Sequence, residues 1–127
     1  MIEAKENFNN TWPFNPNFFS GNGFKQHYVD EGKENNKVIL CLHGEPTWGY
    51  IYRHFIKELS KNFRVVVPDL MGFGKSETPK NKEYSLKTHV ENLENLVNYL
   101  ELKNIYFVGQ DWGGPILGAY TLRNLTN

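Results

Sequence analysis

The residues best suited to chemistry lie in residues 109–114, GQDWGG. An apolar run, residues 105–108, precedes this segment, and a stretch compatible with a helix, residues 115–122, follows it. Glycines on both sides of Asp111 allow a sharp turn between strand and helix, which pushes the Asp111 side chain out at the carboxyl end of the strand. A carboxylate presented in this way can attack an electrophilic carbon directly, so the pattern favours displacement at an alkyl carbon.

A second polar segment, residues 43–48 (HGEPTW), follows the apolar run 38–42 (VILCL). Taken alone, Asp111 could simply cap the helix that follows it. Because the carboxyl ends of parallel strands meet at one edge of a sheet, however, we expect both polar segments to lie on the same edge. Two chemically unusual loops at one edge favour a functional site over a helix cap.

The elements that position these loops are predicted from hydrophobic periodicity. Continuous apolar runs of strand length occur at 38–42, 64–68 and 105–108, and a short, partly polar strand is expected at 25–31. Amphipathic helices are expected at 51–59 and 86–100, the second with Ser85 as its cap. The alternation predicts an α/β fold with a mostly parallel sheet and flanking helices.

The amino-terminal residues form a separate region in this interpretation. Prolines and asparagines alternate with large aromatic residues between residues 11 and 23. Proline disfavours regular structure while aromatic side chains require burial, so the pattern predicts an irregular arm packed on the body of the protein. The predicted division is an arm over residues 1–24 and a core domain over residues 25–127.

Composition excludes several classes of function. The chain has 127 residues, 39% of them apolar and 22% charged, with a net charge of zero. Nucleic acids and anionic membranes select an excess of Lys and Arg, so neither is expected as a partner. Residues 1–10 lack the apolar run of a signal peptide, and no run reaches membrane-spanning length, so we expect a cytoplasmic protein.

The remaining titratable residues do not suggest a metal or a cofactor. The single cysteine, Cys41, lies inside an apolar run and is expected to be an inert core residue. No histidine or carboxylate cluster has metal-ligand spacing. His27, His54 and His89 are isolated in predicted strands and helices, and we expect them to be solvated or to act as caps.

Four stretches together resemble one known family. They are HYVDEG, LCLHGEPTWGYIYR, RVVVPDLMGFGKSETP and FVGQDWGG. From about Trp12 to Leu122 the chain resembles the amino-terminal part of an α/β-hydrolase of the haloalkane dehalogenase family. The resemblance implies a partial α/β-hydrolase core without the cap and the carboxyl-terminal strands of the family.

The resemblance also implies a mechanism and site residues. Asp111 would displace halide from a small halogenated alkane, and water would hydrolyse the resulting alkyl-aspartyl ester to an alcohol. The indole N–H of Trp112 would stabilise the departing halide. The backbone N–H groups of Glu45 and Trp112 would form an oxyanion hole, and the Glu45 side chain would hold the hydrolytic water. Structural roles near the site would fall to His43, Gly44, Gly109 and Gly113.

Family members are longer than this chain. The family's catalytic histidine, the acid that orients it, its cap and a second halide-binding residue lie downstream of the matching region. We therefore expect the chain to be a truncated or split product that lacks turnover alone, with a complementing carboxyl-terminal segment as a partner.

Two other functions remain open from the sequence. An epoxide hydrolase also uses an aspartate in a Gly-x-Asp-x-Gly turn, although that family commonly has an aromatic residue at the Glu45 position. A non-catalytic remnant could instead use the strand at 105–110 as an interaction edge, because its outer side would lack a neighbouring strand.

Overall fold

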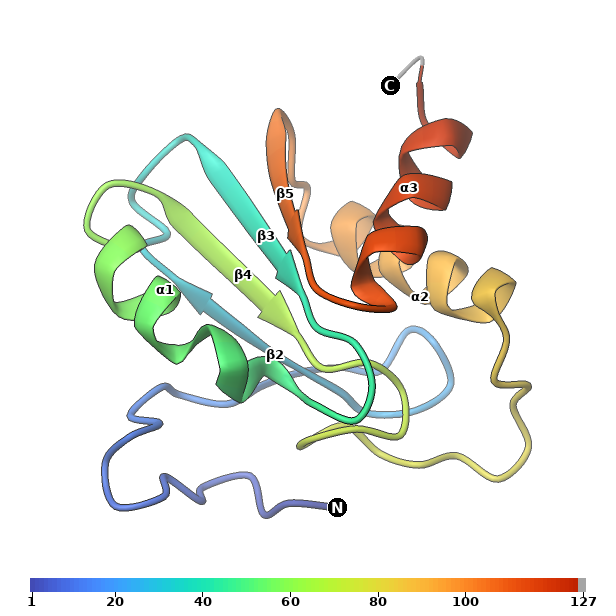
Figure 1. Cartoon of the computed structure of the whole chain (residues 1–127), viewed down its shortest axis with the longest axis horizontal. Helices are drawn as coiled ribbons and strands as arrows, with labels where there is room; N and C mark the ends of the chain where they lie inside the picture. The colour runs from blue at the N-terminus through green and yellow to red at the C-terminus, as the bar shows by residue number, and fades with distance from the viewer. Residues whose placement is uncertain (126–127) are drawn as a thin grey trace.

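A five-stranded sheet organises the chain in the computed structural model, which describes residues 1–125 (Figure 1). The strands are β1 (Asn17–Phe19), β2 (Gln26–Glu31), β3 (Val38–Leu42), β4 (Arg64–Pro68) and β5 (Ile105–Gly109), in the order β1-β2-β4-β3-β5. β3 is parallel to both β4 and β5, and β2 is antiparallel to both β1 and β4. Every described strand except β2 therefore points the same way, which confirms the mostly parallel sheet.

Helices cover both faces of this sheet. They are the short helix η1 (Gly49–Tyr52), α1 (Arg53–Leu59), α2 (Leu86–Tyr99) and α3 (Gly113–Arg123). α2 begins where expected, because the Ser85 hydroxyl accepts a hydrogen bond from the Thr88 N–H at 3.2 Å. The Gly-rich segment 109–114 thus runs from the last residue of β5 into the first turn of α3.

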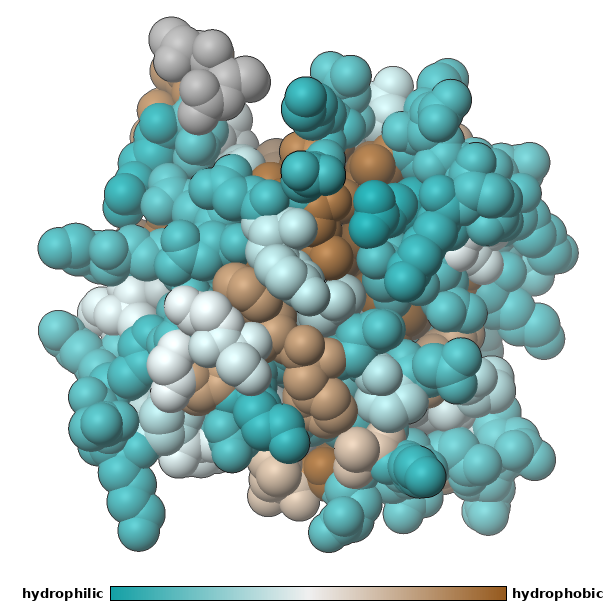
Figure 2. All heavy atoms as spheres, turned by 180° about the vertical axis from the view of Figure 1, so that it is seen from behind, coloured by the Kyte–Doolittle hydropathy of each residue, from teal (hydrophilic) through white to brown (hydrophobic). Residues whose placement is uncertain are grey.

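Two apolar clusters form the core, one on each face. Leu40, Leu42 and Val66 of the sheet pack with α2 and α3, while Ile39 and Cys41 pack with α1 and the amino-terminal arm. Successive β3 residues alternate between the clusters because strand side chains point to opposite faces. Apolar side chains form only a narrow band between polar ones on the face seen in Figure 2.

Cys41 is a core residue, as expected. It is fully buried, and burial raises the pKa of its thiol to about 12. The thiolate is the reactive form, so this side chain is an inert packing group.

The amino-terminal arm is more ordered than the sequence suggests. Residues 17–19 form β1 and pair with β2, where an irregular segment was expected. Trp12 is 1% exposed and packs against Trp48 with ring centroids 4.9 Å apart. The Lys75 ammonium donates to the carbonyl oxygens of Ala4 and Glu6, both at 2.7 Å. These contacts attach the arm to the loops that follow β3 and β4.

His27 is not solvated, and the expectation that it would be was wrong. Five consecutive residues of β2, 26–30, are buried, so the side chains of this strand are covered on both faces of the sheet. His27 is fully buried, and its Nδ1 lies 2.9 Å from Asp69 Oδ2. Asp69 also accepts the N–H groups of Gly49 and Lys75, at 2.8 and 2.9 Å. The pair therefore connects β2 to the loops that follow β3 and β4.

β5 ends the sheet. It pairs with β3, and its other side has no strand partner within residues 1–125. Tyr106 in this strand is 59% exposed.

None of the helices within the described range is both long enough and apolar enough to span a bilayer.

Candidate active site

Asp111 occupies the sharp turn predicted from its neighbours. The residue has a φ of 54°, in the left-handed region that non-glycine residues rarely adopt. The Gly113 N–H donates to the Gln110 carbonyl at 2.9 Å, and the Gly114 N–H donates to the Asp111 carbonyl at 3.0 Å. This backbone geometry ends β5, starts α3 and leaves the Asp111 side chain exposed between them.

The surrounding glycines are required by close backbone approach. A Cβ on Gly44 would lie 2.7 Å from both Asp111 Oδ2 and the Gln110 carbonyl oxygen. A Cβ on Gly109 would lie 3.0 Å from Leu117 Cδ1. A Cβ on Gly113 would overlap the carbonyl oxygen of Leu42 in β3. The glycines at 44 and 113 therefore allow the turn to approach the end of β3, and Gly109 allows α3 to pack closely on β5.

The Asp111 carboxylate already receives backbone hydrogen bonds. The Glu45 N–H donates to Asp111 Oδ2 at 3.0 Å. This bond and a second one from the Trp112 N–H lower the pKa of Asp111 below its ordinary value. The carboxylate is therefore ionised at neutral pH. Ionised Asp111 therefore contributes to the stability of the fold. The contribution is fully present above the unfolded-state pKa of Asp111 and is lost as pH falls through its lower folded-state pKa.

His43 supports the loop that carries Glu45. The side chain is fully buried, its Nδ1 lies 2.8 Å from the Gly44 carbonyl, and its Nε2 lies 2.8 Å from the Leu70 nitrogen. The Leu70 N–H must donate to Nε2, so Nδ1 carries the ring proton and donates to Gly44. Burial lowers the pKa of His43. With both nitrogens engaged, the neutral ring holds the loop and has no free site for a proton.

A side-chain contact completes the link between the two loops. The Gly44 N–H donates to Gln110 Oε1 at 3.0 Å. The Thr47 hydroxyl donates to the Gly44 carbonyl at 2.8 Å. Because Gln110 precedes Asp111, these contacts fix the distance between the Glu45 N–H and the carboxylate that it meets.

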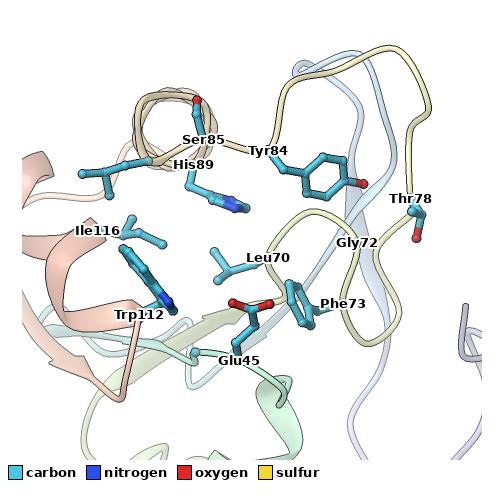
Figure 3. Close-up of a pocket in the computed structure, with 12 residues that line it drawn as sticks. Glu45, Leu70, Gly72, Phe73, Thr78, Tyr84, Ser85, His89, Trp112 and Ile116 are labelled. Carbon is cyan, nitrogen blue, oxygen red and sulfur yellow. The ribbon is translucent and has the colours of Figure 1, made fainter.

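A cavity of about 360 Å³ adjoins this turn (Figure 3). Its walls are mostly apolar, and they include Leu70, Phe73 and Ile116. Figure 3 shows the carboxylate of Glu45 and the ring of His89 directed into the cavity. An alkyl chain fits such a lining better than a charged ligand does.

Asp111 itself is not among the residues that line this cavity. With Trp112 and Pro115 it borders a more open depression of about 220 Å³. Trp112 borders both spaces and is 51% exposed. A ligand whose reacting carbon meets Asp111 would therefore pass the indole and extend its chain into the cavity.

His89 lines the cavity, which the sequence analysis did not predict. It was expected to be solvated or capping, but it is half-buried on α2 and lines the cavity, whereas His54 is exposed as expected. The signal was present in the spacing, because His89 precedes Leu93 and Leu96 on one helical stripe. A polar residue at the start of an apolar stripe can face a site at the edge of the sheet.

No group of three or more metal-ligating side chains occurs in residues 1–125.

Comparison with known proteins places this geometry in context. Residues 37–127 match the family described as the α/β hydrolase fold. The chain is 42% identical over 105 residues to haloalkane dehalogenase 2 of Mycobacterium bovis, covering 83% of this chain and 36% of that protein. The chain thus spans little more than a third of the length of this curated relative.

Solved structures of similar enzymes superpose on this chain. The tetrameric haloalkane dehalogenase of Paraglaciecola agarilytica superposes with a TM-score of 0.84 at 40% identity, over 89% of this chain and 40% of that one. An epoxide hydrolase of Vigna radiata superposes with a TM-score of 0.78 at 32% identity, over 86% of this chain and 36% of that one. A haloalkane dehalogenase and an epoxide hydrolase therefore both share the architecture that β3, β5 and their loops form here.

Proposed function

Because the chain belongs to the α/β hydrolase fold family, we propose that it carries the nucleophile and oxyanion hole of a haloalkane dehalogenase. The reaction would cleave a carbon–halogen bond through an alkyl-aspartyl ester and yield an alcohol and a halide. The observation that carries this proposal is Asp111, an exposed carboxylate in a strained turn that two backbone N–H groups already contact. The similarity to haloalkane dehalogenases supports the substrate class.

The first step forms the ester. One Asp111 oxygen attacks the sp³ carbon opposite the halogen, a carbon–oxygen bond forms, and halide leaves with the bonding electron pair. The Trp112 indole is a hydrogen-bond donor only, and it borders both Asp111 and the apolar cavity. It would donate to the halide as negative charge develops there.

The second step is hydrolysis. Water would add to the carboxyl carbon of the ester, and the oxyanion on Asp111 would accept hydrogen bonds from the Glu45 and Trp112 N–H groups. Collapse of this intermediate breaks the bond between the carboxyl carbon and the alkyl oxygen, which releases the alcohol and restores Asp111. The Glu45 carboxylate, which faces the cavity, would hold the attacking water.

The attacking water must also lose a proton. His43 has both ring nitrogens engaged and is neutral, so it is a poor base. We propose that a complementing carboxyl-terminal segment supplies the base. In the 127-residue chain the ester should therefore form faster than it is hydrolysed, and it should accumulate.

Covalent trapping tests the proposal. We expect 1-bromobutane to add one butyl group to the purified chain, and peptide mapping by mass spectrometry to locate the ester on Asp111. Free bromide should appear in a single burst equal to the protein concentration. Labelling spread over many carboxylates, or none at all, would contradict the assigned nucleophile, and steady bromide release would contradict the proposal that a further segment supplies the base.

Epoxide hydrolysis is the second candidate, because an epoxide hydrolase shares this architecture at 32% identity. Ring opening of an epoxide by Asp111 would leave a hydroxyalkyl ester and no halide. Styrene oxide and 1-bromobutane can therefore be compared on the same chain. Faster labelling by the epoxide would favour this alternative.

Trp112→Phe should slow ester formation by roughly 10- to 100-fold, because one donor to the developing halide charge is lost. The substitution keeps the backbone N–H that contacts Asp111, and the Trp112 side chain is half-exposed, so the free energy of unfolding should change little. The measurement is the labelling rate with matched alkyl chlorides, bromides and iodides. The loss should be largest for chloride, which depends most on hydrogen bonding, and an equal loss for all three would exclude a halide contact.

A further inference from the structure

The ring of His89 has no role in the steps described above, yet it faces the cavity. It lies on the first turn of α2 beside Ser85 and Leu86, which line the same wall. Figure 3 shows the tip of the ring pointing into the space between Leu70 and Tyr84. Burial, with a smaller contribution from His43, lowers the pKa of His89, so the ring is neutral at pH 7.

The two nitrogens of His89 have different surroundings. Nδ1 is buried and has no hydrogen-bond partner among the described residues, and the ring that carries Nε2 points into the cavity. A buried N–H without a partner costs more than a buried lone pair without one, and such orphaned N–H groups are rare. The proton therefore belongs on Nε2. His89 presents an N–H donor to whatever occupies the cavity.

Charge near the cavity restricts what this donor can bind. The amino-terminal end of α2 carries a partial positive charge that favours electron-rich atoms. The Glu45 carboxylate faces the same space and would repel an anion. The combination fits an uncharged oxygen. The apolar side chains of Leu70, Phe73 and Ile116 between them suit a hydrocarbon chain.

We propose that the Nε2–H of His89 binds a neutral acceptor oxygen on the substrate chain, so that the site prefers haloalkanes bearing an ether, carbonyl or hydroxyl group remote from the halogen. This inference rests on the proposed function, because it assigns the substrate chain of the same site. His89 acts as a specificity determinant, and it takes no part in bond making at Asp111.

Isosteric bromides test this assignment. 1-Bromohexane is compared with ethers of equal chain length, such as 1-bromo-3-ethoxypropane, in which the oxygen is moved along the chain. The readout is the ratio of labelling rates at Asp111 for ether over hydrocarbon. We expect at least one ether to show a ratio roughly 3- to 10-fold higher in the wild type than in His89→Phe, the range of one neutral hydrogen bond.

Matched variants separate binding from structure. His89→Phe fills the same space without a donor and should lower the ether-to-hydrocarbon ratio, while His89→Gln keeps a donor and should retain part of the ether preference. Equal ratios in wild type and His89→Phe would overturn the inference while leaving the nucleophile intact. Absence of labelling by every bromide would instead count against the proposed function.

A nuclear magnetic resonance measurement tests the donor without any reaction. Long-range proton–nitrogen spectra should show the Nε2–H tautomer for His89 and the Nδ1–H tautomer for His43, which serves as the internal reference. Adding 3-ethoxypropan-1-ol should shift the His89 Nε2 resonance more than adding 1-hexanol. Finding the proton on Nδ1 of His89 would contradict the proposal even if Asp111 were never labelled.

Discussion

Asp111→Asn is expected to lower the rate of labelling by 1-bromobutane by roughly 10⁶-fold, the scale of loss when an enzyme's nucleophile is removed. A neutral amide is a far weaker nucleophile than a carboxylate. The fold should survive, since asparagine tolerates the left-handed conformation that φ of 54° requires. Its amide oxygen can also accept the Glu45 N–H. The measurement is the intact mass of the chain over time.

Glu45→Gln is the matched control for this experiment. It removes the other carboxylate near the turn but keeps the backbone N–H that contacts Asp111. Labelling should persist in Glu45→Gln and disappear in Asp111→Asn. Because the pKa of Asp111 is lowered, the wild-type labelling rate should stay constant between about pH 5 and 8. Equal labelling of both variants would reject Asp111 as the nucleophile.

Gly113→Ala should destabilise the chain by about 2–4 kcal/mol, the upper part of the range for single substitutions. The added Cβ would overlap the Leu42 carbonyl oxygen and lie 2.9 Å from the His43 carbonyl oxygen. Both atoms belong to the backbone at the end of β3, and they cannot move aside as a flexible side chain could. Either α3 shifts outward or the turn at Asp111 opens, so labelling by 1-bromobutane should fall as well.

Gly114→Ala is the matched control one residue later. A Cβ there meets no atom within 4 Å, and the residue lies within α3. We expect it to stabilise the chain by about 0.5–1 kcal/mol, because alanine is a better helix former than glycine. Urea denaturation followed by circular dichroism measures both variants. Equal midpoints for the two variants would contradict the close approach of α3 to β3.

Hydrophobic patterns were sufficient to predict the main elements of the fold. The apolar runs at 38–42 and 64–68 coincide with β3 and β4, and Ser85 caps α2 as expected. Glycine spacing predicted the turn at Asp111, which the backbone φ confirms. These features depend on residues close together in the chain, so local propensity and turn chemistry are enough to specify them.

The sequence alone also placed the two polar loops on one edge of the sheet, but their contact depends on strand register. β3 and β5 pair so that Leu42 lies opposite Gly109. This register brings the Glu45 N–H within 3.0 Å of the Asp111 carboxylate. A shift of one residue would reverse the side chains of β5 and separate these groups.

The histidines show most clearly what the tertiary structure decided. By sequence, His27, His54 and His89 looked alike, each isolated in its own element. In the fold, His27 is buried against Asp69, His54 is exposed, and His89 faces the cavity. Periodicity reports which face of an element is apolar, but the partner that covers that face comes from distant parts of the chain. The sequence gives the identity and position of each residue of this site. Their burial, tautomers and neighbours are decided only when distant segments of the chain pack together.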